Sequence, residues 1–333
     1  MNIPFDDNRS IPKYRHIIDA IQRKLRSGEL KKGDKIPSLN MLCKQYGLSQ
    51  DTVLMAYSEL KSKGIISSQV GKGYFIRNPN IEYKLNVLLV FDTLTAYKEE
   101  LYNAFKEAIQ PNGREQIFFH HNNLQMFQTI LDGAVGNYSH YVIMPIDHAD
   151  AKAAIAKLPP KKVFILDQGR KRYKNIYPFV CQDFEIDIYN ILSKHHSQVN
   201  KYRRMLLVIR NQRSHFRDIV SGFQNFCKQH PIRAEVVSDI KIFKIKKGDA
   251  YIVVDDRDLD FLVRYSIEKK MALGVDIGII SYNETALKGI VASGITTIST
   301  DFAKMGKRMA DMVLQHKKLK IDNPFLMYER SSF

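Results

Sequence analysis

The stretch YGLSQDTVLMAYSELKSKGII, residues 46–66, decides the fold of the N-terminal part of the chain. Ser49 is a good N-cap and Gly64 a typical helix stop, so a helix is expected over about 50–63. Helical spacing gives this helix one apolar face, made of Val53, Ala56, Tyr57 and Leu60. The residues nearer solvent are Gln50, Asp51, Thr52, Met55, Ser58 and Lys61. The pattern predicts a helix that rests on a core and presents polar side chains outward.

The flanking segments predict a small domain of three helices and a hairpin. Upstream, apolar residues recur at helical spacing over about 13–27, and a short helix is expected over 39–46 after an N-cap at Ser38. Downstream, residues 65–68 and 74–76 are expected to form two strands around a tight glycine-containing tip. Helix, short helix, turn, helix and hairpin make a winged helix-turn-helix, whose third helix fits the major groove of DNA.

The charge of the chain points to a polyanionic partner. Its 333 residues carry a formal net charge of +16, which suits nucleic acid or an anionic membrane surface. Residues 1–77 contain 14 Lys and Arg against 7 Asp and Glu, an excess suited to neutralising phosphates. The N-terminal sequence MNIPFDDNRS does not resemble a signal peptide, and the longest apolar runs are only strand-sized. We therefore expect a cytoplasmic protein with no membrane partner that binds double-stranded DNA.

The cysteines and histidines predict no metal site and no cofactor. The three cysteines, at positions 43, 181 and 227, lie far apart without a Cys-x-x-Cys pair, so buried free thiols are expected. The histidine pairs 120–121 and 195–196 are sequence neighbours, and adjacent histidines do not readily form a chelate.

Three segments of the N-terminal part resemble a known family. GELKKGDKIPSLNML (28–42), the stretch at 46–66 and GKGYFI (71–76) are similar to the GntR family DNA-binding domain. The chain departs from the family at Asn40 and Gln50, where arginines that contact phosphate and guanine usually stand. Gln50 suits adenine N6 and N7, so an operator richer in A·T pairs is one hypothesis. The alternative is that Gln50 only faces phosphates.

The candidate DNA-contacting residues lie on the expected second and third helices and the hairpin. Four lysines, at positions 44, 61, 63 and 72, are candidates for phosphate contacts, and any one of them could equally be an ordinary solvated lysine. The full set is Ser38, Asn40, Lys44, Ser49, Gln50, Asp51, Thr52, Met55, Tyr57, Lys61, Lys63 and Lys72.

From residue 85 onward the pattern changes to alternating strands and helices. LNVLLVF (85–91) is a continuous apolar run, as expected of a parallel strand covered on both faces. Two such series predict an α/β fold class with two lobes of doubly wound parallel sheet behind the winged helix-turn-helix. The expected boundaries are a DNA-binding domain at 1–77, a linker at 78–84 and an effector-binding domain at 85–333, with lobe 1 at about 85–184 plus 284–318 and lobe 2 at about 185–283 plus 319–333.

Polar residues follow the expected strands, at the edge where doubly wound sheets bind ligands. Carboxylates, amides, arginines and an aromatic ring suit a polyol such as a sugar. The alternative is that the strand-end aspartates cap the next helix. The candidates are Asp92, Thr93, Thr95, Tyr97, Lys98, Asp147, Asp167, Gln168, Asp183, Arg210, Arg213, Arg217, Asp255, Asp256 and Asn283.

The C-terminal half also resembles a known family. DIGIISYNETAL (276–287), GITTISTDFAKMGKRMADMVL (294–314) and YERSS (328–332) are similar to the LacI-type, periplasmic-binding-protein-like effector domain. The resemblance implies ligand-contacting strand ends at Asp167, Asp183, Asp255 and Asn283, the last standing where the family often has aspartate. The family's ligand arginine is replaced by Ile219, so its role would fall to Arg210, Arg213 or Arg217.

A GntR-like head joined to a LacI-like body resembles the architecture of arabinose- or fucose-responsive repressors. The resemblance implies a homodimeric repressor of carbohydrate utilisation genes, controlled by a small sugar such as L-fucose or L-arabinose. Whether the sugar releases or promotes DNA binding stays open.

The sequence leaves two other classes of protein as alternatives. One is a DNA-binding head fused to a sugar- or nucleotide-processing α/β enzyme. No GxGxxG follows a strand, and neither GxxxxGK[ST] nor GxSxG occurs, so no enzyme is expected. The other is an architectural DNA binder that responds to no ligand.

Overall fold

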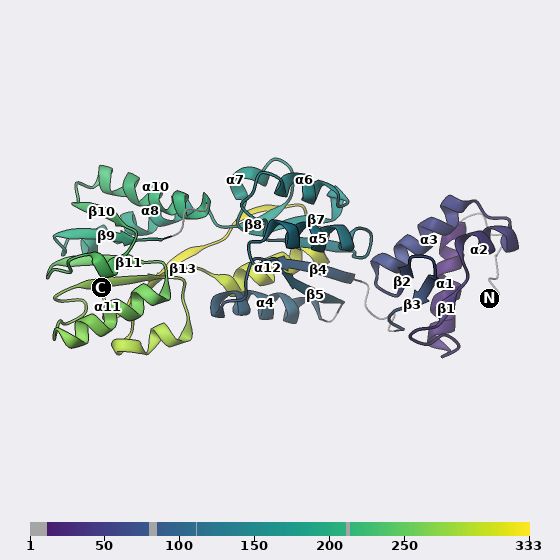
Figure 1. Cartoon of the computed structure of the whole chain (residues 1–333), viewed down its shortest axis with the longest axis horizontal. Coiled ribbons are helices and arrows are strands. Elements are labelled where there is room, and N and C mark those ends of the chain that lie inside the picture. The colour runs from purple at the N-terminus through teal and green to yellow at the C-terminus, as the bar shows by residue number, and fades with distance from the viewer. Residues whose placement is uncertain (1–11, 80–84, 111, 211–213) are drawn as a thin grey trace. The chain divides into compact units, whose positions relative to one another are not determined.

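The computed structural model describes residues 12–79, 85–110, 112–210 and 214–333. Its N-terminal part, called the head here (residues 12–79), has the expected winged helix-turn-helix, with the wing enlarged to a three-stranded antiparallel sheet of order β1-β3-β2 (Figure 1). The elements are α1 (Lys13–Arg26), β1 (Lys35–Ile36), α2 (Leu39–Tyr46), α3 (Gln50–Ser62), β2 (Ile66–Gln69) and β3 (Gly73–Ile76).

A single apolar core holds the head together. Ile17 and Ile21 of α1, Leu42 of α2, and Val53 and Leu60 of α3 are all fully buried in it. These residues recur at helical spacing, which is why each helix presents one face to the core and leaves the other for solvent or a partner.

The first sheet of the α/β part has the order β14-β8-β7-β6-β4-β5. Strand β4 is buried along its whole length, as its largely apolar sequence predicts, and its polar residue Asn86 is buried too. The strands are β4 (Leu85–Phe91), β5 (Gly113–Phe119), β6 (His140–Ile143), β7 (Val163–Asp167), β8 (Phe179–Cys181) and β14 (Lys320–Asp322). The helices between them are α4 (Ala96–Ile109), α5 (Leu124–Ala134), α6 (Ala151–Ala156), the 3-10 turn η1 (Pro160–Lys162) and α7 (Arg170–Tyr173).

The second sheet has the order β10-β9-β11-β12-β13-β15, parallel except for β15. Its strands are β9 (Arg204–Val208), β10 (Ala234–Val237), β11 (Asp249–Val253), β12 (Gly278–Tyr282), β13 (Thr296–Thr300) and β15 (Phe325–Tyr328). The remaining helices are α8 (Phe184–Lys194), α9 (His196–Val199), α10 (Ser214–Gln229), α11 (Asp256–Glu268) and α12 (Phe302–Leu314), with 3-10 turns η2 (Ile240–Ile242), η3 (Ala286–Gly289) and η4 (Val291–Ser293).

Helices cover both faces of the second sheet. Leu207 packs with α8 and α10, whereas its neighbour Leu206 packs on the opposite face with α11, because successive strand residues point to opposite sides (Figure 1). Helices α8 and α10 cross at Gly222, where a Cβ atom would lie 2.1 Å from the Glu185 carbonyl oxygen. This doubly wound arrangement is the one that the alternating pattern predicts.

The lobe boundaries differ from the expected ones at two strands. β13 was expected in lobe 1 but pairs with β12 in the second sheet, with Ile280 opposite Thr296. β14 was expected in lobe 2 but pairs with β8 in the first sheet, with Ile321 opposite Val180. The chain therefore changes sheets after β13 and again after β14, at points that are set by long-range strand pairing. Residues 80–84 of the expected linker lie outside the described residues.

None of the helices in the described part of the chain has the length and apolarity that crossing a bilayer requires.

Candidate nucleic-acid interface and ligand-binding residues

Serine caps fix the N-termini of the two helices of the helix-turn-helix. Ser49 Oγ accepts a hydrogen bond from the Thr52 backbone N–H at 3.3 Å and lies 2.8 Å from Thr52 Oγ1. Ser38 Oγ accepts from the Met41 backbone N–H at 3.2 Å. Each cap satisfies an N–H group that the first helical turn leaves without an intrahelical partner. Both serines, proposed as DNA contacts, also have this structural role.

The outward face of α3 is the one expected from the sequence, with one addition. Gln50, Asp51 and Met55 are exposed, and Thr52 is half-buried. Leu54, which helical spacing did not single out, is also exposed. Its signal in the sequence is its position four residues after Gln50, one turn along the same side of the helix.

The tip of the wing is a tight turn between β2 and β3. The Lys72 backbone N–H donates to the Gln69 carbonyl at 3.1 Å, and Gly71 and Gly73 have φ values of 72° and 110°. Glycine adopts these angles without steric cost, which keeps the tip narrow. The Lys72 side chain is exposed there, where it suits a phosphate contact.

The other candidates of the head differ in their freedom to contact DNA. Asn40 and Lys44 on α2 are exposed, and Lys61 is half-buried. Lys63 Nζ forms an ion pair with Glu59 Oε1 at 2.7 Å, so part of its charge is already balanced within the protein. Lys44 and Lys72 are therefore the stronger phosphate candidates.

Tyr57 is wrong as a DNA-contact candidate. Its side chain is buried in the core of the head, and its hydroxyl donates to the Pro37 carbonyl at 2.6 Å. Burial raises the pKa of the Tyr57 hydroxyl, and the ring packs edge-on against Tyr74. Its helical spacing already places it on the apolar face, and the structure agrees with the spacing.

Among the effector candidates, those after β4 and β6 are mostly covered. Asp92 Oδ1 accepts from the Thr93 backbone N–H at 2.7 Å. The Tyr97 ring lies 4.9 Å from the Phe302 ring, centroid to centroid, so one of its faces is used within the protein. Other candidates from this part of the chain are buried or half-buried: Thr95, Lys98, Asp147 and Gln168.

A polar network joins the ends of β7, β8 and β14. Gln182 Nε2 donates to Asp167 Oδ1 at 2.6 Å, and the Gln182 backbone N–H donates to the Asp167 carbonyl at 2.9 Å. Arg170 forms ion pairs with Asp183, at 2.8 Å, and with Asp322. The sequence pointed to Asp167 and Asp183 but missed Arg170, because its partner Asp322 is 152 residues away.

The same region holds a carboxyl group with an unusual affinity for protons. Burial, together with the negative charges of Asp183 and Asp322, raises the pKa of Asp187 to about 7. Two buried atoms nearby, Gln182 Oε1 and the Tyr282 hydroxyl, have no hydrogen-bond partner among the described residues. Over those same residues, no three His, Cys, Asp or Glu side chains are grouped to hold a metal ion.

Replacing Asp187 by asparagine should change how stability depends on pH. Because the folded state raises this pKa from 3.8 to about 7, protonation favours folding, and the wild-type chain loses stability as pH rises between these values. The Asp187→Asn variant should lack this loss and be the more stable protein at pH 8. Thermal unfolding at pH 4.5 to 8 measures the difference, and parallel curves for the two proteins would contradict it.

The candidate arginines differ in their surroundings. Arg210 forms an ion pair with Asp258, whose side chain is fully buried, so it neutralises that carboxylate. Arg217 is exposed on α10. Arg213 lies outside the described residues.

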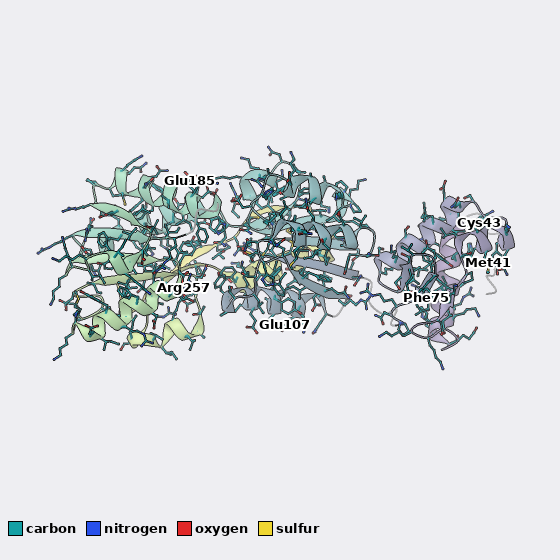
Figure 2. All side chains as sticks on the ribbon, viewed as in Figure 1. Met41, Cys43, Phe75, Glu107, Glu185 and Arg257 are labelled. Carbon is teal, nitrogen blue, oxygen red and sulfur yellow. The ribbon has the colours of Figure 1, made fainter. Side chains whose placement is uncertain are left out.

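At the ends of β11 and β12 the carboxylates have partners within the protein. Asp255 Oδ1 accepts from the Arg257 backbone N–H at 2.9 Å, so it caps α11, and it also pairs with the Arg257 side chain. The buried Lys288 Nζ lies 2.8 Å from Asp256 Oδ1 and donates to the Asn283 carbonyl at 2.9 Å. Asp255 therefore caps the next helix, as the alternative interpretation of the strand-end aspartates expects. Sequence reasoning missed Lys288 and these contacts. Figure 2 labels Arg257 and shows it at this end of α11.

Two family models match the chain. Residues 13–76 match bacterial regulatory proteins of the gntR family, and residues 195–324 match the periplasmic binding protein-like domain.

The repressor YtrA of Bacillus subtilis is 33% identical over 99 residues, which cover 30% of this chain and 72% of YtrA. MngR, the mannosyl-D-glycerate transport/metabolism system repressor of Escherichia coli, is 35% identical over 81 residues, covering 24% of this chain and 34% of MngR. The regulator YdfD of B. subtilis is 39% identical over 70 residues, covering 21% of this chain and 14% of YdfD. The chain therefore spans 34% of MngR and 14% of YdfD.

Solved structures share the fold of the α/β part. A dimeric Lac repressor with a C-terminal deletion has a TM-score of 0.63 at 18% identity, covering 74% of this chain and 98% of that chain. A transcription regulator-like protein of Staphylococcus haemolyticus has a TM-score of 0.59 at 14% identity, covering 75% and 98%. These structures show that the described α/β part of the chain has the two-lobed periplasmic-binding-protein-like fold.

Proposed function

Because the chain belongs to the gntR family of bacterial regulatory proteins, we propose that it is a transcriptional repressor whose affinity for operator DNA is controlled by a small polyhydroxy ligand. The observation that carries the proposal is a capped helix α3 with an exposed polar face, in the same chain as a periplasmic-binding-protein-like domain. As a homodimer, the protein would place two copies of α3 on the half-sites of a pseudo-palindromic operator.

The DNA-binding part of the proposal is supported by shape and charge together. Helix α3 is held by the core on one side and is open on the other, which is the condition for entering a major groove about 12 Å wide. The exposed Lys44 on α2 and Lys72 on the wing flank it in the fold of the head and suit the phosphate backbone.

The ligand part is supported by the polar groups at the strand ends. Gln182 Oε1 and the Tyr282 hydroxyl are buried oxygen atoms that a ligand hydroxyl could satisfy, and leaving such groups unpaired costs free energy. Asp167 and Asn283, which the LacI-type resemblance implies as ligand contacts, would add further acceptors. MngR represses a mannosyl-D-glycerate system, so sugars and their derivatives are the first ligands to test, with L-fucose and L-arabinose among them.

The test is a thermal-shift screen of the full chain against mono- and disaccharides, followed by operator binding with and without each ligand that shifts the melting temperature. At least one sugar should stabilise the protein, by about 2.7 kcal/mol at 100 times its Kd. The same sugar should change operator affinity by about 5–150-fold. The Gln182→Leu variant should bind the operator normally and lose the response to the sugar. Tight operator binding that no sugar alters would contradict control by a polyhydroxy ligand.

A further inference from the structure

The exposed large apolar side chains of the head are confined to the elements that would face DNA. Within the described head they are Met41 on α2, Leu54 and Met55 on α3, and Val70 at the wing tip. Leu54 is 45% exposed and Met55 54% exposed, although each lies on a helix whose other side packs in the core of the head. Figure 2 labels Met41 and shows it on the outer side of α2. Helix α1 and the loop after it carry none.

The two apolar residues of α3 stand in line with its polar ones. Leu54 follows Gln50 by four residues, and Met55 follows Asp51 by four, so each pair shares one side of the helix. The opposite side, with Val53 and Leu60, is buried. An element that enters the groove with Gln50 forward would therefore carry Leu54 and Met55 in with it.

We propose that Leu54 and Met55 read thymine by contact with its C5-methyl group. The proposal rests on the proposed function and adds a base preference to it. The positive charge of the head indicates which partner contacts these residues. Residues 1–77 hold 14 Lys and Arg against 7 Asp and Glu, which favours a polyanion over an apolar protein surface. In the major groove of unmodified DNA, the apolar group that a side chain meets at a base edge is the methyl of thymine.

The combination gives α3 a defined preference. Gln50 suits adenine through N6 and N7, whereas Leu54 and Met55 suit the methyl of thymine in the neighbouring base pairs. The half-site should thus contain adjacent A·T pairs. The apolar contacts should determine which strand carries the thymine of each pair. Removing water from both the side chain and the methyl group supplies the favourable free energy.

The experiment replaces single thymines of a selected operator by deoxyuridine, which keeps the base-pairing groups and lacks the methyl. With the full-length wild-type chain, affinity should fall about fourfold for each contacted methyl at one or two positions of each half-site. The Leu54→Ala variant should bind operators with uracil and with thymine at one of these positions with equal affinity. The Met55→Ala variant should do the same at another position. Alanine is a strong helix former, so neither variant should unfold α3.

A matched control is Ile267→Ala, which removes an exposed isoleucine from α11, outside the head, and should leave all thymine effects unchanged. If replacing thymine by uracil left the affinity of the wild-type chain unchanged at every position, the proposal would be overturned. A uracil effect that persists in both α3 variants would also overturn it, because the methyl would then act through DNA shape. If no operator can be selected at all, the proposed function itself fails, and the uracil comparison is never reached.

Discussion

Replacing Arg204 by alanine is expected to lower the free energy of unfolding of the second-sheet lobe by about 3–5 kcal/mol. Arg204 lies at the start of β9 and faces Asp249 at the start of β11. Its Nη2 is 2.6 Å from Asp249 Oδ2 and its Nε is 3.1 Å from Oδ1, with the arginine side chain 10% exposed and the aspartate 5%. Removing the guanidinium leaves a buried carboxylate that, among the described residues, keeps a hydrogen bond from the Tyr251 hydroxyl at 3.0 Å. Urea unfolding followed by far-UV circular dichroism measures the loss.

Two comparisons show whether the cause is the unpaired charge. Arg264→Ala breaks an ion pair with Asp260 in which both side chains are well exposed, and it should cost less than about 1 kcal/mol. The combined variant Arg204→Met, Asp249→Leu removes both charges and should recover much of the stability lost by Arg204→Ala. An Arg204→Ala chain that is no less stable than Arg264→Ala would contradict the argument.

The head could be predicted from the sequence because its determinants are local. Ser38 and Ser49 cap helices that begin at the next residue, and the apolar spacing of α3 gives its buried face, Tyr57 included. Each signal acts within about one helical turn, so it can be recognised without knowing any distant contact. The prediction of Tyr57 as a contact was wrong because its own helical spacing places it on the buried face of α3.

The exchange of strands between the two sheets could not be predicted in the same way. The segment TTIST indicates a strand wherever it pairs, and neither its sequence nor that of KID (320–322) says with which sheet it pairs. Their places depend on partners such as β12 and β8, and β8 is about 140 residues before β14 in the chain. Long-range pairing of this kind is a property of the whole chain.

The ligand-binding candidates illustrate a further limit. The position of Arg210 at a strand end made it a ligand candidate, yet Asp258, 48 residues later, takes its guanidinium. Conversely, Arg170 has no conspicuous pattern around it, although it joins Asp183 and Asp322. Sequence position indicates which edge of a sheet a side chain occupies, whereas its partners depend on packing between distant segments.

Replacing Gln50 by alanine is expected to lower operator affinity by about 5–150-fold per half-site, the range that corresponds to losing one bidentate base contact worth about 1–3 kcal/mol. Gln50 is exposed at the first position of α3, where the cap at Ser49 holds the helix end, so the substitution should leave the fold of the head intact. The loss should be confined to specific DNA, with the preference relaxed at one base pair of each half-site. Lys72→Ala provides the contrast, because a lost phosphate contact should weaken binding to all sequences alike and reduce the salt slope by about 0.9. Fluorescence anisotropy with operator and random duplexes at several salt concentrations separates the two. If Gln50→Ala weakened both duplexes equally, Gln50 would be a phosphate contact, and the preference for A·T pairs would have to come from Leu54 and Met55 without it.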